Sequence, residues 1–315
     1  MPEPRAEIGV IGGSGFYAMP ELTETEVVEL STPFGPPSSA LTIGTLHGRR
    51  VAFIARHGEG HHILPGELPA QANIHALKSI GVQRLFAVSA VGSLQQQLEP
   101  LHAVIPDQLI DRTRGRDSSF FGDGMVAHVG FADPFCPDLA SQLAFAGEGS
   151  GVTTHRGGAL VVIEGPAFST RAESQLYRSW GAAIVGMTAL PEAKLAREAE
   201  LCYGALCFVT DYDVWHEHEA DVSADLIMQN LQLNVERGRA IISATVAALP
   251  QQRDCKCGDA LGSALVTAPH LVPAETRERL DLLLRRYHGP AGEAGEAGEA
   301  GGAAGTEAET EGADS

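Results

Sequence analysis

Two carboxylates placed two positions apart are the residues of this sequence best suited to acid–base chemistry. Asp211 and Asp213 follow the apolar run 203–209, which predicts a buried strand. Side chains at positions i and i+2 of an extended chain point to the same side, so both carboxylates would face one ligand. Burial and a neighbouring like charge both raise the pKa of a carboxyl group, which can then act as a general acid. A solvated turn and a metal site are the alternatives.

Residues suited to binding an anion follow other apolar runs. Arg56 and His57 come directly after one predicted strand, Ser89 ends a second, and Thr188 follows a third. Arginine suits bidentate recognition of phosphate. Each of these residues is common in ordinary turns. Because α/β folds bind ligands at the ends of their strands, the set together predicts a phosphate-sized site at one sheet edge.

A glycine-rich turn follows the first apolar run. Residues 13–18 fit the pattern G-x-G-x-x-A, which is typical of dinucleotide-binding folds. That fold needs a helix to open at the turn, and Pro20 follows here without any helical periodicity. The turn therefore disfavours a nicotinamide dinucleotide. Its small residues let backbone N–H groups and the Ser14 hydroxyl approach a single phosphate closely.

The histidines do not show the spacing of a metal site. His216-Glu217-His218 lacks the HExxH pattern and a third ligand, and His57, His61 and His62 lack carboxylate or cysteine companions. We therefore expect no metal.

Five cysteines are too few and too irregularly spaced for a disulfide framework. Cys202 and Cys207 lie in an apolar segment and are expected to be small buried hydrophobic residues. Cys255 and Cys257 are separated by one residue, lack the spacing of a zinc knuckle and have no companion pair in the sequence. They are either a reducible disulfide or two thiols in a loop.

The elements that must position these residues alternate along the chain. Period-two and continuous apolar runs predict strands at 7–11, 42–54, 85–91, 103–109, 160–163, 183–187 and 203–209. Helical spacing predicts helices at 70–80, 171–180, 191–201, 223–249 and 271–287. Residues 112–130 are predicted to be a loop. Alternating strands and helices indicate an α/β fold with one sheet flanked by helices, and no break interrupts a single domain over 1–288.

Charge and composition exclude several classes of partner. The 315 residues include 40 acids and 22 bases, for a net charge of −18, and 44% are hydrophobic. A strongly acidic protein is a poor partner for nucleic acid or an anionic membrane. No apolar run approaches the length of a membrane span, and the N-terminus lacks the features of a signal peptide. We expect a cytoplasmic protein without nucleic-acid or membrane partners.

The charge is unevenly distributed. Residues 289–315 carry seven acids and no base, so 33 acids and 22 bases remain for residues 1–288. The repeated Gly-Glu-Ala triplets break off too soon for collagen, and they predict a disordered acidic tail.

Six motifs stand in a specific order along the chain. They are IGVIGGSG at 8–15, ARHG at 55–58, SAVGSL at 89–94, EGPAFSTRAE at 164–173, GMT with PE within 186–192, and TDYD at 210–213. In this order they resemble the methylthioadenosine phosphorylase branch of the trimeric purine nucleoside phosphorylase family. The resemblance spans residues 7–250, with weaker similarity to about residue 287. It implies a central mixed β-sheet flanked by helices, and it leaves the tail without a counterpart.

The family's roles transfer to individual positions of this sequence. The resemblance implies that phosphate is held by Ser14, Arg56, His57, Ser89, the Ala90 N–H and Thr188, and that Asp211 and His57 are catalytic. It places the nucleoside against Phe168, Met187, Asp211, Tyr212, Asp213, His128, Val222, Ile227 and Met228. The resemblance also implies that Ser169 and Ala224 are specificity positions. His128 would reach the methylthio pocket of a neighbouring subunit, and Ala224 is smaller than the valine of some relatives.

The implied reaction is phosphorolysis of methylthioadenosine in purine and methionine salvage, by a homotrimer that uses phosphate as co-substrate and no cofactor. Asp211 favours adenine, because a carboxylate accepts a hydrogen bond from a 6-amino group whereas asparagine suits a 6-oxopurine better. A phosphorylase that prefers 6-oxopurines is the nearest alternative. A hydrolytic nucleosidase has little use for the Arg56/His57 site, and a non-phosphorolytic nucleotide-binding protein rests only on the glycine turn.

Overall fold

The computed structural model describes residues 5–13, 16, 19–216 and 224–288, with the backbone alone at 224–229, 231 and 288. The predicted tail at 289–315 therefore lies outside the described residues. No described helix combines the length and the apolar character that crossing a bilayer requires.

Within the described residues, eleven strands form one mixed sheet, in the order β2-β3-β4-β1-β5-β10-β9-β7 with β11, β6 and β8 branching from β5. The strands are β1 (Ile8–Gly12), β2 (Thr23–Val28), β3 (Leu41–Leu46), β4 (Arg49–Ala55), β5 (Arg84–Ser93), β6 (Ala103–Ile105), β7 (Gln108–Arg112), β8 (Thr154–Arg156), β9 (Ala159–Ile163), β10 (Ile184–Gly186) and β11 (Cys202–Asp211). Strands β4, β1, β5 and β11 run parallel. Every residue of β1 and β11 is buried, as expected for strands covered on both faces.

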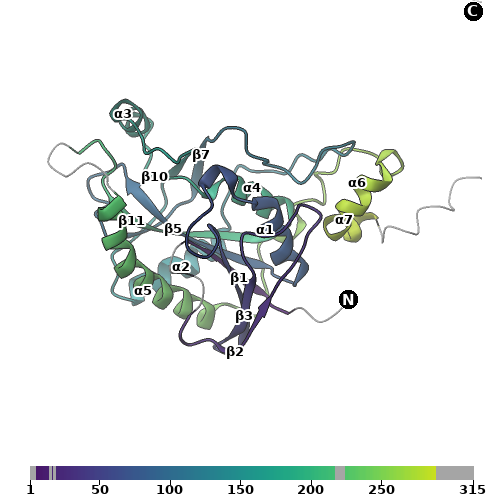
Figure 1. The fold of residues 1–315 in the computed structure, drawn as a ribbon, viewed down its shortest axis with the longest axis horizontal. Helices are drawn as coiled ribbons and strands as arrows, with labels where there is room; N and C mark the ends of the chain where they lie inside the picture. Colours follow the sequence, from purple (N-terminus) through teal and green to yellow (C-terminus); the bar gives the residue numbers. More distant parts are fainter. Residues whose placement is uncertain (1–4, 14–15, 17–18, 217–223, 289–315) are drawn as a thin grey trace, which may run out of the picture.

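Helices cover both faces of the sheet (Figure 1). They are α1 (Ala70–Ser79), α2 (Pro137–Gly149), α3 (Arg171–Ser179), α4 (Ala189–Glu198), α5 (Ala224–Ala248), α6 (Ala274–Arg279) and α7 (Asp281–His288), with short 3-10 turns η1 (Pro65–Glu67), η2 (Lys256–Asp259) and η3 (Pro269–Leu271). Successive side chains of β11 pack against opposite faces of the sheet. Ala205, Cys207 and Val209 pack in the core with α1 and α4, whereas Leu206 and Phe208 pack with α2 and α5.

The predicted α/β class is confirmed, with two differences in the helices. The predicted helix 271–287 is divided into η3, α6 and α7, because Pro273 is the N-cap of α6 and Leu280 leaves helical geometry at φ −95° and ψ 4°. Helix α2 was not predicted. Its run of small residues gives a weak apolar period, and Pro137 at its first position was the available signal.

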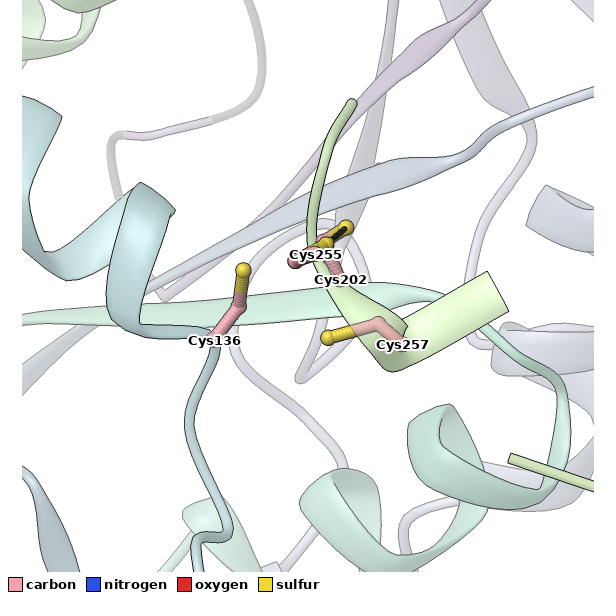
Figure 2. Close-up of side chains that lie close together, drawn as sticks. All are labelled: Cys136, Cys202, Cys255 and Cys257. Atoms are coloured by element: carbon pink, nitrogen blue, oxygen red, sulfur yellow. Dashed lines mark hydrogen bonds between the residues drawn. The ribbon is translucent and has the colours of Figure 1, made fainter. Parts of the chain in front are cut away.

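The expectation that Cys255 and Cys257 have no companions is wrong. Their sulfurs and those of Cys136 and Cys202 all lie within 4.8 Å of one another (Figure 2). The companions come from the start of α2 and the start of β11, so sequence spacing could not reveal them. All of these cysteines are free thiols, in agreement with the second of the two alternatives for the pair.

Candidate active site

The carboxyl ends of β1, β4, β5 and β11 meet at one edge of the sheet. Gly12 of β1 is in register with Ala55 of β4 and with Val88 of β5. Asp211, the last residue of β11, is in register with Gly92 of β5. Residues that follow or end these strands therefore gather at the same edge, as the sequence predicted.

A pocket opens at this edge beside the glycine turn. Its lining includes Gly13, Phe16, Ser89, Ala90, Phe208 and Asn234. Among the described residues, the first helical segment after β1 is the 3-10 turn η1, which follows β4. No described helix therefore begins at the glycine-rich turn. Instead Phe16 folds back over β1, where a side-chain carbon on Gly12 would lie 2.4 Å from its Cβ. This geometry disfavours a dinucleotide site and leaves space beside Ser89 and Ala90.

Arg56 is held in a buried network under this edge. Its Nε donates to Glu192 Oε2 at 2.9 Å, Nη2 donates to Glu192 Oε1 at 3.2 Å, and Nη1 and Nη2 donate to carbonyls of β5 and β1. Tyr203 Oη also donates to Glu192 Oε1, at 2.8 Å. Arg56 is only 1% exposed. Burial opposes its charge, but the Glu192 carboxylate outweighs burial and raises the pKa of Arg56.

These bonds use four of the five guanidinium N–H groups. One N–H of Arg56 is left outside this network, and the positive charge is fixed in position under the sheet edge. Sequence reasoning quoted Glu192 within a motif but gave it no role, and the structure shows that it positions Arg56.

The imidazole ring of His57, the next residue, is held in one tautomer. Its Nδ1 lies 2.8 Å from the carbonyl oxygen of Ile63, which only accepts, so Nδ1 carries the proton and Nε2 is an acceptor. The ring stacks on His61 at 4.3 Å. Burial, together with the charge of Arg56, lowers the pKa of His57 to about 4. His57 is thus neutral at pH 7.

Thr188 and Met187 reach the site from β10. Thr188 is the N-cap residue of α4, yet its hydroxyl caps no N–H group of the described chain, so it is free for a ligand. Arg116 fixes this turn: its Nη1 donates to the carbonyls of Met187 (2.8 Å) and Leu190 (2.6 Å), and its Nε lies 3.0 Å from Glu164 Oε2. Arg116 lies in the predicted loop, and nothing in its sequence context indicated this role.

Replacing Arg116 by alanine is expected to raise KM for the nucleoside roughly tenfold, because the lost hydrogen bonds to a charged group are each worth about 1.5–3 kcal/mol and hold Met187 in place. A change confined to positioning leaves kcat less affected than KM. Arg114→Ala, an exposed neighbour whose backbone N–H rather than side chain contacts Glu164, is the matched control. Steady-state kinetics of both variants measure the effect, and equal KM values would refute it.

The two aspartates lie at the end of β11 and are buried, 5% and 6% exposed. Asp211 Oδ2 accepts from Thr210 Oγ1 at 2.7 Å, and Oδ1 accepts from the Asp213 N–H at 2.8 Å. Burial raises the pKa of Asp211, although these two bonds oppose the rise. Burial and the charge of Asp211 also raise the pKa of Asp213. The structure thus supplies the environment that a carboxylic acid needs to keep its proton.

Neighbouring residues fix the position of Asp211. A side-chain carbon on Gly92 would lie 3.0 Å from Asp211 Oδ1, closer than an ordinary van der Waals contact. Glycine at this position of β5 therefore leaves room for the Asp211 carboxyl group. Asn230 Nδ2 donates to the Thr210 carbonyl at 2.7 Å, and Asn234 Nδ2 donates to the Val209 carbonyl at 3.4 Å. Both asparagines join α5 to the end of β11, and sequence reasoning missed them because helix periodicity gives weight only to apolar positions.

The predicted purine-side residues lie around the start of α3. Thr170 and Glu173 form a reciprocal capping box, which fixes Ser169 in the preceding position. The Ser169 hydroxyl is close enough to Asp213 to lower its pKa, yet it makes no hydrogen bond of standard geometry within the described structure. Phe168 is 45% exposed, as a stacking residue in an open site would be. Tyr212 instead donates to the Gln96 carbonyl at 3.3 Å, so its contact with substrate stays a prediction.

Other predicted residues are not joined to this site within the single chain. His128 is exposed, and its backbone N–H donates to the Ala264 carbonyl at 2.8 Å. Ser14 and Val222 lie outside the described residues, as do the side chains of Ala224, Ile227 and Met228 at the start of α5. The roles assigned to these residues remain predictions.

Comparison with known proteins decides the family. A model described as the Phosphorylase superfamily matches residues 7–247. The chain belongs to the phosphorylase superfamily. The predicted resemblance is thereby confirmed at the level of the superfamily, and the matched range includes Arg56, Glu192 and Asp211.

Members of the superfamily resemble the chain over nearly its whole length. The S-methyl-5'-thioadenosine phosphorylase of Thermosynechococcus vestitus is 55% identical over 286 residues, covering 90% of this chain and 99% of the relative. That of Koribacter versatilis is 53% identical over 285 residues, covering 90% and 98%.

Two solved structures also resemble this chain. A methylthioadenosine phosphorylase from an antarctic soil metagenomic library has a TM-score of 0.86 and 49% identity, covering 90% of this chain and all of the other. The Schistosoma mansoni methylthioadenosine phosphorylase in complex with adenine has a TM-score of 0.77 and 35% identity, covering 82% and 96%.

Proposed function

We propose that the protein catalyses phosphorolysis of S-methyl-5'-thioadenosine to adenine and 5-methylthioribose 1-phosphate. The observation that carries this proposal is Asp211, a buried carboxyl of raised pKa at the sheet edge that also holds Arg56, His57 and Ser89. Its chain is 53–55% identical to relatives named for that activity. The enzyme is a pentosyltransferase that acts in purine and methionine salvage.

Phosphate binds beside the glycine turn. The charge of Arg56, the Ala90 N–H and the hydroxyls of Ser89 and Thr188 hold its oxygens. Neutral His57 accepts a hydrogen bond from the P–OH group of monohydrogen phosphate at Nε2, because its Nδ1 proton is already donated to the Ile63 carbonyl. Phosphate fixed under C1' stabilises the oxocarbenium-like charge of the transition state and then forms the new bond at C1'.

The purine leaves as the C1'–N9 bond breaks. Negative charge builds on the departing base, and a protonated Asp211 donates to N7 and neutralises it. Burial supplies the raised pKa that this role requires. The Asp211 carboxyl also accepts from the 6-amino group, so adenine is preferred over a 6-oxopurine.

The test of this proposal is adenine release from methylthioadenosine with and without inorganic phosphate. We expect release to fall to background when phosphate is removed, and 5-methylthioribose 1-phosphate to appear in equal amount to adenine. Release that is undiminished without phosphate would show a hydrolase. A higher kcat/KM for inosine or methylthioinosine than for methylthioadenosine would overturn the preference for adenine.

We propose in addition that the enzyme is a cytoplasmic homotrimer without a redox or organic cofactor. His128 is exposed, and its described contact is with Ala264, which is not one of the predicted site residues. This surface position supports a contribution of His128 to the site of a neighbouring subunit. A trimer brings such an exposed residue to a second chain.

A further inference from the structure

Four cysteine sulfurs converge on a single point at the end of the sheet opposite the active site. Cys202 begins β11, Cys136 is the N-cap of α2, and Cys255 and Cys257 enclose the start of η2 (Figure 2). Their sulfurs all lie within 4.8 Å of one another. Three separate segments of the chain therefore contribute to one cluster.

The spacing of the sulfurs fits a mononuclear metal site. A tetrahedral zinc with Zn–S bonds of about 2.3 Å has S···S edges of about 3.8 Å. The sulfurs of Cys202 and Cys255 are 3.2 Å apart, well beyond a disulfide bond of about 2.0 Å. A cluster of several irons would hold its cysteines farther apart than the 4.8 Å found here.

Two positively charged features lie beside the cluster. Cys136 is the N-cap residue of α2 and therefore stands at the positive end of the helix dipole. Arg253 Nη1 lies 3.9 Å from Cys202 Sγ while it donates to the Glu200 carbonyl at 2.9 Å. A positive helix end and a cation beside the sulfurs both favour thiolates.

We propose that Cys136, Cys202, Cys255 and Cys257 bind one Zn²⁺ in a tetrahedral site of four thiolates. On binding, the four thiols release four protons to solvent and form four Zn–S bonds, with no change of oxidation state. This inference departs from the sequence expectation that the protein holds no metal, which rested on spacing within local motifs.

The site is structural. Four protein ligands leave no open position for substrate. Cys202 and Asp211 occupy opposite ends of the ten-residue β11, roughly 30 Å apart at a rise of about 3.3 Å per residue. Zinc would fasten the segment after α5, which contains η2, to the central strand that ends in the catalytic carboxylate.

The experiment begins with the full-length protein, purified under reducing conditions without added metal and analysed by plasma mass spectrometry. We expect one zinc per chain. Cys255→Ser, the partly exposed ligand, is expected to lower zinc occupancy roughly tenfold or more after dialysis. Cys207→Ser is the matched control, since Cys207 is a buried cysteine of the same strand outside the cluster and should retain full zinc.

A second measurement does not depend on the variants folding. Replacing zinc by Co²⁺ in the wild type should give the sulfur-to-cobalt charge-transfer and strong ligand-field bands of tetrahedral thiolate coordination. A chelator should lower the melting temperature of the wild type and of Cys207→Ser, while Cys255→Ser is unaffected. Reduced protein that neither contains zinc nor takes up zinc or cobalt would overturn the proposal, as would bound iron or a Cys255→Ser variant with full zinc.

Discussion

Replacing Asp211 by asparagine is expected to lower kcat/KM for methylthioadenosine by roughly 10²- to 10⁴-fold, the usual contribution of a general acid. Asparagine preserves the size of the side chain and its acceptor for the Thr210 hydroxyl. It cannot deliver a proton to the departing purine. Steady-state kinetics with excess phosphate measure the loss, and Asp138→Asn, an exposed aspartate in the first turn of α2, is the control.

The same substitution should alter the choice of purine. The asparagine amide donates to a 6-oxo group, so the ratio of kcat/KM for methylthioinosine to that for methylthioadenosine should rise. A variant that keeps wild-type activity on methylthioadenosine would remove Asp211 from the mechanism. A variant that loses activity on both nucleosides with no change in their ratio would leave the acid role intact and refute the specificity role.

Replacing Glu192 by alanine is expected to lower the free energy of unfolding by about 3–5 kcal/mol, because it leaves the Arg56 charge buried and without its carboxylate. Tyr203 also loses its acceptor. The released guanidinium no longer holds its orientation, so KM for phosphate should rise along with the loss of stability. Chemical denaturation and phosphate titrations measure the two effects.

Two variants separate these effects. Glu26→Ala breaks exposed ion pairs with Arg5 and Arg50 and should cost less than about 1 kcal/mol. The double variant Arg56→Met/Glu192→Gln holds no buried charge and keeps an acceptor for Tyr203, so it should recover much of the stability and yet catalyse no phosphorolysis. Recovery of activity in the double variant would contradict the role of Arg56 in holding phosphate.

The strands were the most predictable part of the fold. Continuous apolar runs predicted β1, β5 and β11 because strands buried on both faces carry no polar alternation. The helices of weak apolar period were less predictable. Helix α2 consists largely of small residues, and the helix predicted at 271–287 breaks where Leu280 leaves helical geometry.

The sequence by itself determined the set of reactive groups: an arginine and a histidine after one strand, a serine in another, and two aspartates at the end of a third. Local chemistry and strand topology suffice for this, since parallel strands bring their carboxyl ends together. Only the tertiary structure decided how these groups are held. Glu192 and Arg116 act through contacts with residues up to 136 positions away, and the four cysteines meet from three segments. Such partners leave no pattern along the chain, because packing in space, and not spacing in sequence, brings them together.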